Sequence, residues 1–206
     1  TEPMNLWYRV VRTCCRLAFS TVFPCKVTGR EHVPDHGPLL VLSNHQSHLD
    51  PLAIAAASPR RLRALARESL FFWPLSWMIR SLGAIPVGST GSTRSSLKAT
   101  FEHLENGTAM LIFPEGTRTE DGEIAELQSG FQMLTRRKNP VVLPMAIAGS
   151  FHAWPKSRYL PRPGRLAIAF GKPISAEEYS DWGARQFEAH IATCLKECLN
   201  EAEQIR

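Results

Sequence analysis

The stretch LLVLSNHQSHLD, Leu39–Asp50, joins an apolar run to a polar turn that carries two histidines and a carboxylate. A short continuous apolar run is typical of a strand that is buried on one or both faces of a sheet. The run ends near Ser43, and Pro51 follows soon after the turn. We therefore expect a strand that ends near Ser43, with His45 on the turn at its carboxyl end.

Similar apolar runs recur along the chain and predict further strands. They are Leu62–Ala66, Ala84–Val87, Ala109–Phe113, Val141–Ile147 and Arg165–Phe170. Helical segments are expected between and after them: one spans Thr93–Asn106, and another follows the capping-box pair Ser175 and Glu178. Strands that alternate with helices indicate an α/β fold, with a mostly parallel central sheet flanked by helices.

Length and composition indicate one globular unit with a modest basic excess. The chain has 206 residues, of which 44% are hydrophobic and 21% charged, and it contains no repeat. Its net charge of +5 suits an anionic partner. Nucleic acid is not expected, because the arginines are spread along the chain and no nucleic-acid-binding module is recognisable. The five cysteines show no C-x-x-C pair, which fits a reduced intracellular setting.

The segment Asn5–Phe23 resembles a helix that lies flat on a membrane surface. Three arginines interrupt its apolar character, and each would cost roughly 2.5–3.5 kcal/mol at the centre of a bilayer. At helical spacing Arg9, Arg12 and Arg16 fall on one side. The opposite side carries Leu6, Val10, Cys14, Leu17 and Ala18, with Trp7 near the start.

We therefore expect residues 1–28 to form an amphipathic membrane-associating segment ahead of an α/β domain at residues 29–206. Leu6, Trp7, Arg9, Arg12 and Arg16 are its expected contacts with an anionic membrane surface. The alternative is a helix that packs its apolar side on the protein's own core and leaves the arginines in water.

The turn after the first strand offers an imidazole and a carboxylate. In open α/β sheets ligands bind at the carboxyl ends of the strands. Asp50 follows His45 closely enough to hold one ring N–H, which leaves the other ring nitrogen as a base. His48 opens an alternative, a His-x-x-His-x-Asp metal site, but no nearby Cys or Glu cluster offers a fourth ligand. We predict no metal.

A second polar turn, IFPEGTR at Ile112–Arg118, follows the strand expected at Ala109–Phe113. Gly116 allows the backbone to approach a ligand closely. Arg118 offers a planar fork of donors that suits a phosphate. A salt-bridged surface turn is the alternative for this segment alone. Two polar turns at two strand ends favour one shared cleft.

NHQSHLD followed by FPEGTR and then by VVLPMAI resembles the glycerolipid acyltransferase family, the class of 1-acylglycerol-3-phosphate acyltransferases. The similarity runs from about Gly29 to Gly171. It implies an acyltransferase of phospholipid biosynthesis in which His45 is the general base and Asp50 orients its ring. The base would activate a lysophospholipid hydroxyl for attack on the thioester of acyl-CoA or acyl carrier protein, most simply converting lysophosphatidate to phosphatidic acid.

The resemblance also implies further site residues and a location. The acceptor would contact Asn44, Arg67, Glu115, Gly116, Thr117 and Arg118, with Arg118 on the phosphate. No cofactor is implied, since the acyl thioester is itself a substrate. The expected location is the cytoplasmic face of a membrane, as a monotopic or peripheral protein.

The chain departs from the family pattern at three positions, one of which is Ser69 in place of a glutamate. Ser89 stands where GAIPVGS would have the family's arginine, and Arg67 stands in place of a lysine. The loss of one cation leaves open an acceptor without phosphate, such as a lyso-aminolipid. A non-catalytic membrane-binding module is the alternative from a different class.

Overall fold

The computed structural model describes residues 6–67, 79–80, 83–87, 93–128, 131–136 and 139–206. Within these residues seven strands form one sheet in the order β1-β7-β6-β2-β5-β3-β4. The strands are β1 (Cys25–Thr28), β2 (Leu39–Ser43), β3 (Leu62–Arg67), β4 (Ala84–Val87), β5 (Ala109–Ile112), β6 (Val141–Ala148) and β7 (Leu166–Phe170). All neighbouring pairs are parallel except β6 and β7.

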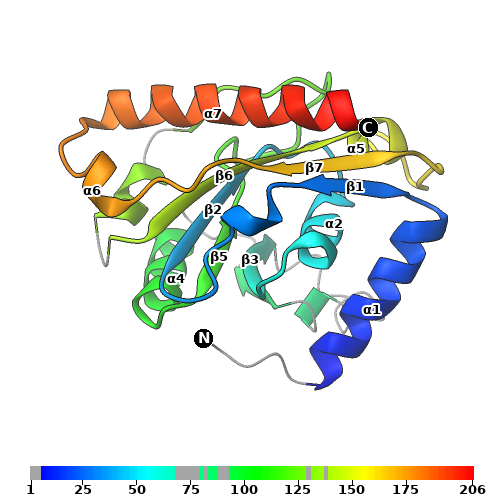
Figure 1. Ribbon diagram of the computed structural model, residues 1–206, viewed down its shortest axis with the longest axis horizontal. Coiled ribbons are helices and arrows are strands. Elements are labelled where there is room, and N and C mark those ends of the chain that lie inside the picture. The colour runs from blue at the N-terminus through cyan, green and yellow to red at the C-terminus, as the bar shows by residue number, and fades with distance from the viewer. Residues whose placement is uncertain (1–5, 68–78, 81–82, 88–92, 129–130, 137–138) are drawn as a thin grey trace.

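Helices cover both faces of the sheet (Figure 1). The α-helices are α1 (Leu6–Thr21), α2 (Asp50–Ala57), α4 (Thr93–Glu105), α5 (Ser150–Ala153), α6 (Ala176–Tyr179) and α7 (Ala184–Ile205). Two short 3-10 helices are η1 (Arg30–His32) and η3 (Phe131–Thr135). The long helix α7 packs on β6 and β7, whereas α1 packs on α2.

The apolar run of β2 is continuous because this central strand is buried on both sides. Leu39 and Val41 join one core with residues of α1 and α2, while Leu40 and Leu42 join another with residues of α4, η3 and α7. Successive strand residues point to opposite faces, so a strand covered on both faces needs apolar residues at every position. The expected α/β class with a mostly parallel sheet is confirmed.

The predicted strands match the structure to within one residue at each end, and the capping box of Ser175 and Glu178 is present. One strand was missed. β1 pairs in parallel with β7, so Cys25–Thr28 belongs to the sheet. The expected boundary after residue 28 is therefore wrong by one strand, because the sheet already begins at Cys25.

The helix α1 divides its surface differently from the expectation. Tyr8, Val11 and Phe19 are buried, but Leu6 and Leu17 are 77% and 62% exposed. The buried side chains thus lie on one side of α1. The other side carries an exposed apolar stripe, formed by Leu6, Trp7, Val10 and Leu17. No helix within the described residues is long and apolar enough to cross a bilayer.

Two of the three arginines of α1 face the protein. Arg12 is buried and donates a hydrogen bond from Nη2 to the carbonyl of Ser58. The Nε–H group of Arg16 donates to the carbonyl of Ala56 at 2.9 Å. Both carbonyls lie at the carboxyl end of α2, where cations are favourable. The expectation that Arg12 contacts lipid head groups is wrong, because its guanidinium is enclosed between α1 and α2.

Candidate active site

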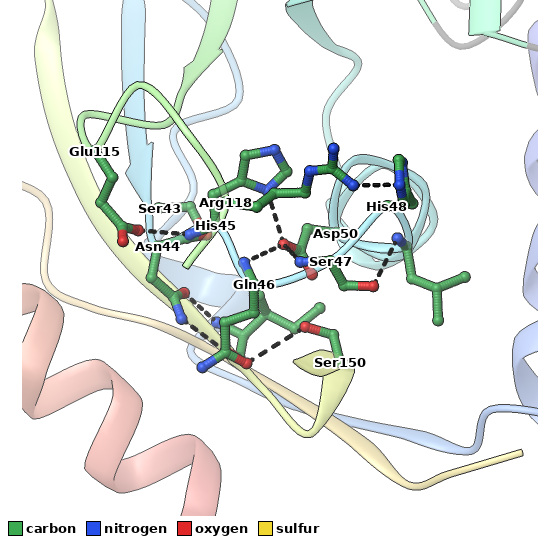
Figure 2. Close-up of polar contacts among 12 residues, drawn as sticks. Ser43, Asn44, His45, Gln46, Ser47, His48, Asp50, Glu115, Arg118 and Ser150 are labelled. Carbon is green, nitrogen blue, oxygen red and sulfur yellow. Dashed lines mark hydrogen bonds and ion pairs between the residues drawn. The ribbon is translucent and has the colours of Figure 1, made fainter. Parts of the chain in front are cut away.

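The two polar turns meet at the same edge of the sheet. β2 and β5 are parallel neighbours, with Leu42 opposite Ile112. The chain leaves β2 into the turn of His45 and leaves β5 into the turn of Glu115. Since both strands end at the same edge, the turns lie side by side, as Figure 2 shows.

The imidazole of His45 is paired with the carboxylate of Asp50. Its Nδ1 lies 2.8 Å from Oδ2 of Asp50, and a carboxylate oxygen accepts, so Nδ1 carries the proton. The same oxygen accepts the backbone N–H groups of Gln46 at 2.6 Å and Ser47 at 2.7 Å. Asp50 is fully buried at the first position of α2. One carboxylate therefore fixes both the ring and the turn that carries it.

The other ring nitrogen of His45 is open for chemistry. Within the described residues, Nε2 of His45 has no hydrogen-bond partner, and the side chain keeps 19% of its surface exposed. The ring stacks on Phe113, with 4.0 Å between ring centroids and 16° between planes. Phe113 is a site residue that the sequence reasoning missed. Stacking and the Asp50 bond together restrict the ring to one orientation.

Glu115 contacts the backbone. Its Oε1 accepts from the N–H of His45 at 2.6 Å, and its Oε2 accepts from the N–H of Ala125 at 2.8 Å. Burial raises the pKa of Glu115, against the lowering effect of these two N–H groups. The carbonyl of His45 accepts from the N–H of Thr119 at 2.9 Å. Glu115 was expected to contact the acceptor, but both carboxylate oxygens are engaged by N–H groups of the protein.

Asn44 is likewise a structural residue in this arrangement. Its amide oxygen accepts from the N–H of Ile147 at 2.9 Å, and its amide nitrogen donates to the carbonyl of the same residue at 3.0 Å. The side chain is 1% exposed. Asn44 therefore ties the turn of His45 to β6, and both polar atoms of its side chain are engaged by the protein.

Arg118 lies against His48 instead of standing alone on the turn. Its Nη1 contacts Nε2 of His48. The ring of His48 also faces Trp154, with 5.1 Å between centroids and 44° between planes. Burial is the main cause that lowers the pKa of His48, with further lowering by Arg118 and His45 and an opposing effect of Asp50. The sequence analysis raised His48 as a metal ligand, an alternative it did not favour, and missed this pairing.

The remaining predicted acceptor contacts are placed in part. Gly116 has a φ of 70°, a left-handed conformation that favours glycine, and an added Cβ would displace the side chain of Gln128. Thr117 is exposed. Arg67 ends β3, next to β5, but its side chain lies outside the described residues, as does all of Ser89.

A pocket of about 240 Å³ lies on one side of the second turn. Arg118 lines it together with Glu120, Asp121 and Glu123. Three carboxyl groups make this side unfavourable for an anion.

The sequence model of the Acyltransferase family matches residues 24–148, which are more than half of the chain. The chain belongs to the Acyltransferase family. This acyltransferase is 29% identical to a 1-acyl-sn-glycerol-3-phosphate acyltransferase of Pseudomonas aeruginosa, over 99% of its own length and 82% of the relative. It is 25% identical to the enzyme of the same name from Limnanthes douglasii, over 82% of its own length. The chain spans 59% of that plant relative.

A solved structure supports the same relationship. The acyltransferase superimposes on the crystal structure of the 1-acyl-sn-glycerophosphate (LPA) acyltransferase PlsC from Thermotoga maritima with a TM-score of 0.82. The two chains are 26% identical, and the match covers 95% of this chain and 79% of the other. Fold and family thus agree with the motifs on the two turns.

Proposed function

We propose that this acyltransferase transfers a fatty acyl group from acyl-CoA or acyl carrier protein to the free hydroxyl of 1-acylglycerol 3-phosphate, which yields phosphatidic acid. The observation that carries the proposal is an oriented imidazole, with Nε2 of His45 open, at the same sheet edge as Arg118. The names of the relatives from Pseudomonas aeruginosa, Limnanthes douglasii and Thermotoga maritima support the choice of acceptor.

The proposed step requires one base and no covalent enzyme intermediate. Nε2 of His45 takes the proton of the acceptor hydroxyl while its oxygen attacks the thioester carbonyl. The tetrahedral intermediate then collapses, the carbon–sulfur bond breaks, and the imidazolium returns the proton to the departing thiolate sulfur. Asp50 stabilises the imidazolium through Nδ1–H throughout. The ester and the free thiol are the products.

The acceptor's phosphate is assigned to Arg118. A guanidinium forms paired hydrogen bonds with phosphate oxygens, which fixes both distance and orientation. The exposed Gly116–Thr117 backbone follows the same turn, and with the phosphate anchored there the glycerol hydroxyl would lie toward His45. Holding the hydroxyl beside its base converts an encounter in solution into a step within one complex.

The stripe of Leu6, Trp7, Val10 and Leu17 supports a location on a membrane surface. Lysophospholipid acceptors partition into bilayers, so an enzyme that rests on the surface meets its substrate there. We place the protein on the cytoplasmic face as a peripheral or monotopic protein, with α1 as its contact. The basic excess of +5 would add attraction to an anionic leaflet.

The test is a transfer assay with purified protein, acyl-CoA or acyl carrier protein as donor, and a panel of lyso-lipids. We expect turnover with 1-acylglycerol 3-phosphate, and a loss of roughly 10²–10⁴-fold in kcat for His45→Ala. His36→Ala, which changes an exposed histidine away from the site, is the matched control. Absence of transfer with every donor and acceptor pair, or an unaffected rate in His45→Ala, would refute the proposal. Vesicle binding without turnover would favour the non-catalytic module.

A second candidate is the same chemistry on an acceptor without phosphate. It is favoured by Ser89, which stands in the position of a family arginine. Turnover of a lyso-aminolipid in preference to lysophosphatidate would support it. The complementary variant is Ser89→Arg: if a missing cation limits the reaction, this substitution lowers the KM for lysophosphatidate, and no change removes the motivation.

A further inference from the structure

His48 lies on the turn between His45 and Asp50, and its ring faces the guanidinium of Arg118 (Figure 2). A guanidinium only donates hydrogen bonds, so Nε2 of His48 is the acceptor in this contact. An imidazole that accepts through Nε2 is neutral and carries its proton on Nδ1. The pair is thus a cation held by a neutral ring.

The ring of His48 is itself held in place. It packs against Trp154, and the hydroxyl of the adjacent Ser47 donates to the carbonyl of Trp154 at 2.7 Å. Ser47 also accepts the N–H of Leu49 at 3.1 Å, so both residues that flank His48 are fixed. The histidine therefore offers Arg118 an acceptor in a defined position.

We propose that His48 positions the Arg118 guanidinium for the acceptor's phosphate, and that this hold is lost when His48 takes up a proton. The inference rests on the proposed function, in which Arg118 binds that phosphate. It gives His48 a positioning role that makes acceptor binding depend on pH. His48 thereby becomes part of acceptor recognition.

The physical reason is the conformational freedom of arginine. An arginine side chain in water samples many rotamers, and binding a ligand must restrict them. A partner that restricts the side chain before binding reduces this cost. On its other side Arg118 shares a pocket with Glu120, Asp121 and Glu123, which would attract the guanidinium away from the cleft. His48 opposes that displacement.

Charged groups around His48 set the direction of the pH effect. Burial lowers the pKa of His48, Arg118 and His45 lower it further, and Asp50 raises it. From the segment that carries Trp154, the ammonium of Lys156 is paired with Glu120 at 3.1 Å. Because the pKa of His48 is lowered, the ring takes up its proton at a lower pH than an ordinary histidine does, and it is neutral at neutral pH. Once protonated, Nε2 becomes a donor and repels Arg118.

The kinetic test compares KM and kcat for 1-acylglycerol 3-phosphate from about pH 5 to about pH 8. His48→Gln keeps an acceptor but does not titrate, His48→Phe keeps a ring without an acceptor, and His36→Gln is the control for loss of an exposed histidine. At the upper pH we expect a normal KM for His48→Gln and a rise of about three- to tenfold for His48→Phe. The kcat of both variants stays within about twofold of the wild type at this pH.

At the acid end the KM of the wild type should rise about three- to tenfold more than that of His48→Gln. The phosphate monoester of the substrate itself gains a proton near pH 6, and this affects both enzymes equally. Comparing the wild type with His48→Gln therefore cancels the contribution of substrate protonation to KM. The proposal is overturned if the wild type and His48→Gln share one pH profile of KM, or if His48→Phe binds the acceptor normally.

A measurement without turnover separates this inference from the proposed function. Histidine ring signals in an NMR titration should show a higher pKa for His48 in Arg118→Gln than in the wild type, because a lowering charge is removed. Glycerol 3-phosphate, used as the probe, should bind about three- to tenfold more weakly to His48→Phe. If the protein gives both expected results but transfers no acyl group to a lyso-lipid, the proposed function is refuted and the positioning role of His48 is not. An unchanged His48 titration in Arg118→Gln refutes the positioning role even in an active enzyme.

Discussion

One carboxylate, that of Asp50, makes several of the hydrogen bonds that hold the site together. Its Oδ2 accepts three hydrogen bonds, from the ring of His45 and from two backbone N–H groups. Within the described residues Oδ1 is buried without a hydrogen-bond partner. A single buried oxygen thus holds the imidazole of His45 in the tautomer protonated at Nδ1 and also closes the turn.

Asp50→Asn should lower kcat by roughly 10²–10⁴-fold, because an amide that donates to Nδ1 would favour the wrong tautomer of His45. The free energy of unfolding should fall by about 1–3 kcal/mol, since an amide nitrogen cannot accept the N–H groups of the turn. Steady-state kinetics and thermal unfolding measure the two effects. Asp181→Asn, an exposed carboxylate, is the control, and full activity in Asp50→Asn would exclude the orienting role.

Glu115→Gln distinguishes a positioning carboxylate from one that binds the acceptor. The glutamine amide has one acceptor where the site uses two, so one N–H group, of His45 or Ala125, loses its partner. We expect a fall of about tenfold to a hundredfold in kcat with a nearly unchanged KM for the acceptor. Glu126→Gln changes an exposed carboxylate in the same segment and should be silent. A rise in KM with an unchanged kcat would instead support a direct contact between Glu115 and the acceptor.

At this scale the sequence identified the residue types and their pairing, but it did not identify what each side chain touches. The spacing of His45 and Asp50 predicts a contact that the structure contains. Glu115 and Asn44 were expected to contact the acceptor because the family resemblance implies that role. Only the packing of β2 against β5 and β6 brings backbone groups to these side chains, and that long-range geometry leaves no local signal.

Among the elements, α1 differs most from its expectation. Its inward side carries Arg12 and Arg16, bound to the last carbonyls of α2, and its outward side carries apolar residues. Helical periodicity correctly separated the arginines from the apolar stripe. It could not show which side faces the protein, because the carboxyl end of α2 lies about forty residues away.

The double variant Leu6→Ser, Leu17→Ser should weaken binding to phospholipid vesicles by roughly tenfold or more, because each side chain loses apolar burial in lipid. Its melting temperature should stay near that of the wild type, since both residues are largely exposed. Vesicle sedimentation and thermal unfolding are the measurements.

Arg12→Ala is the complementary variant of the same helix. Loss of its hydrogen bond to Ser58 should lower the free energy of unfolding by about 1–3 kcal/mol.

If the variant Leu6→Ser, Leu17→Ser sediments with vesicles as the wild type does, the membrane contact lies on another surface of the protein.

β1 escaped the sequence analysis for a physical reason. The strand CKVT is short, lies at the edge of the sheet and is only partly buried. An edge strand packs against one neighbour and needs no continuous apolar run. The signal that revealed β2 is therefore absent from β1.

Over the whole molecule, the core is divided by the sheet, and α7 closes one side of it. Cys198 on α7 is buried above β6 and β7, and an added Cβ at Gly171 would lie 2.7 Å from its Sγ atom. Burial raises the pKa of Cys198 to about 12. The thiol is thus both shielded and protonated as long as α7 stays in place.

A maleimide reagent near pH 8 should modify the exposed Cys14 rapidly and Cys198 roughly a thousandfold or more slowly. Denaturant should remove the difference at the concentration that unfolds the sheet, because α7 packs directly on β6 and β7. Peptide mass mapping over time gives both rates. Comparable labelling of the two thiols in native conditions would mean that α7 opens on its own.

The α/β class followed from the sequence because apolar runs alternate with helical segments. The strand order did not, and neither did the antiparallel pairing of β6 with β7. A parallel pair is usually joined by a crossover helix, whereas the connection after β6 contains only the four-residue helix α5. The direction of β7 relative to β6 can be read only once the two strands are known to be neighbours.

The peptide of His45 joins two parts of the chain that are far apart in sequence. Its N–H is bound by Glu115 and its carbonyl by Thr119, across seventy residues or more. Contacts of such long range form late in folding, because loop closure must precede them. A refolding population should therefore recover helical signal before it recovers catalysis. The time course of recovered acyl transfer would then measure when β2 docks beside β5, so catalytic activity could be used to follow assembly of the sheet.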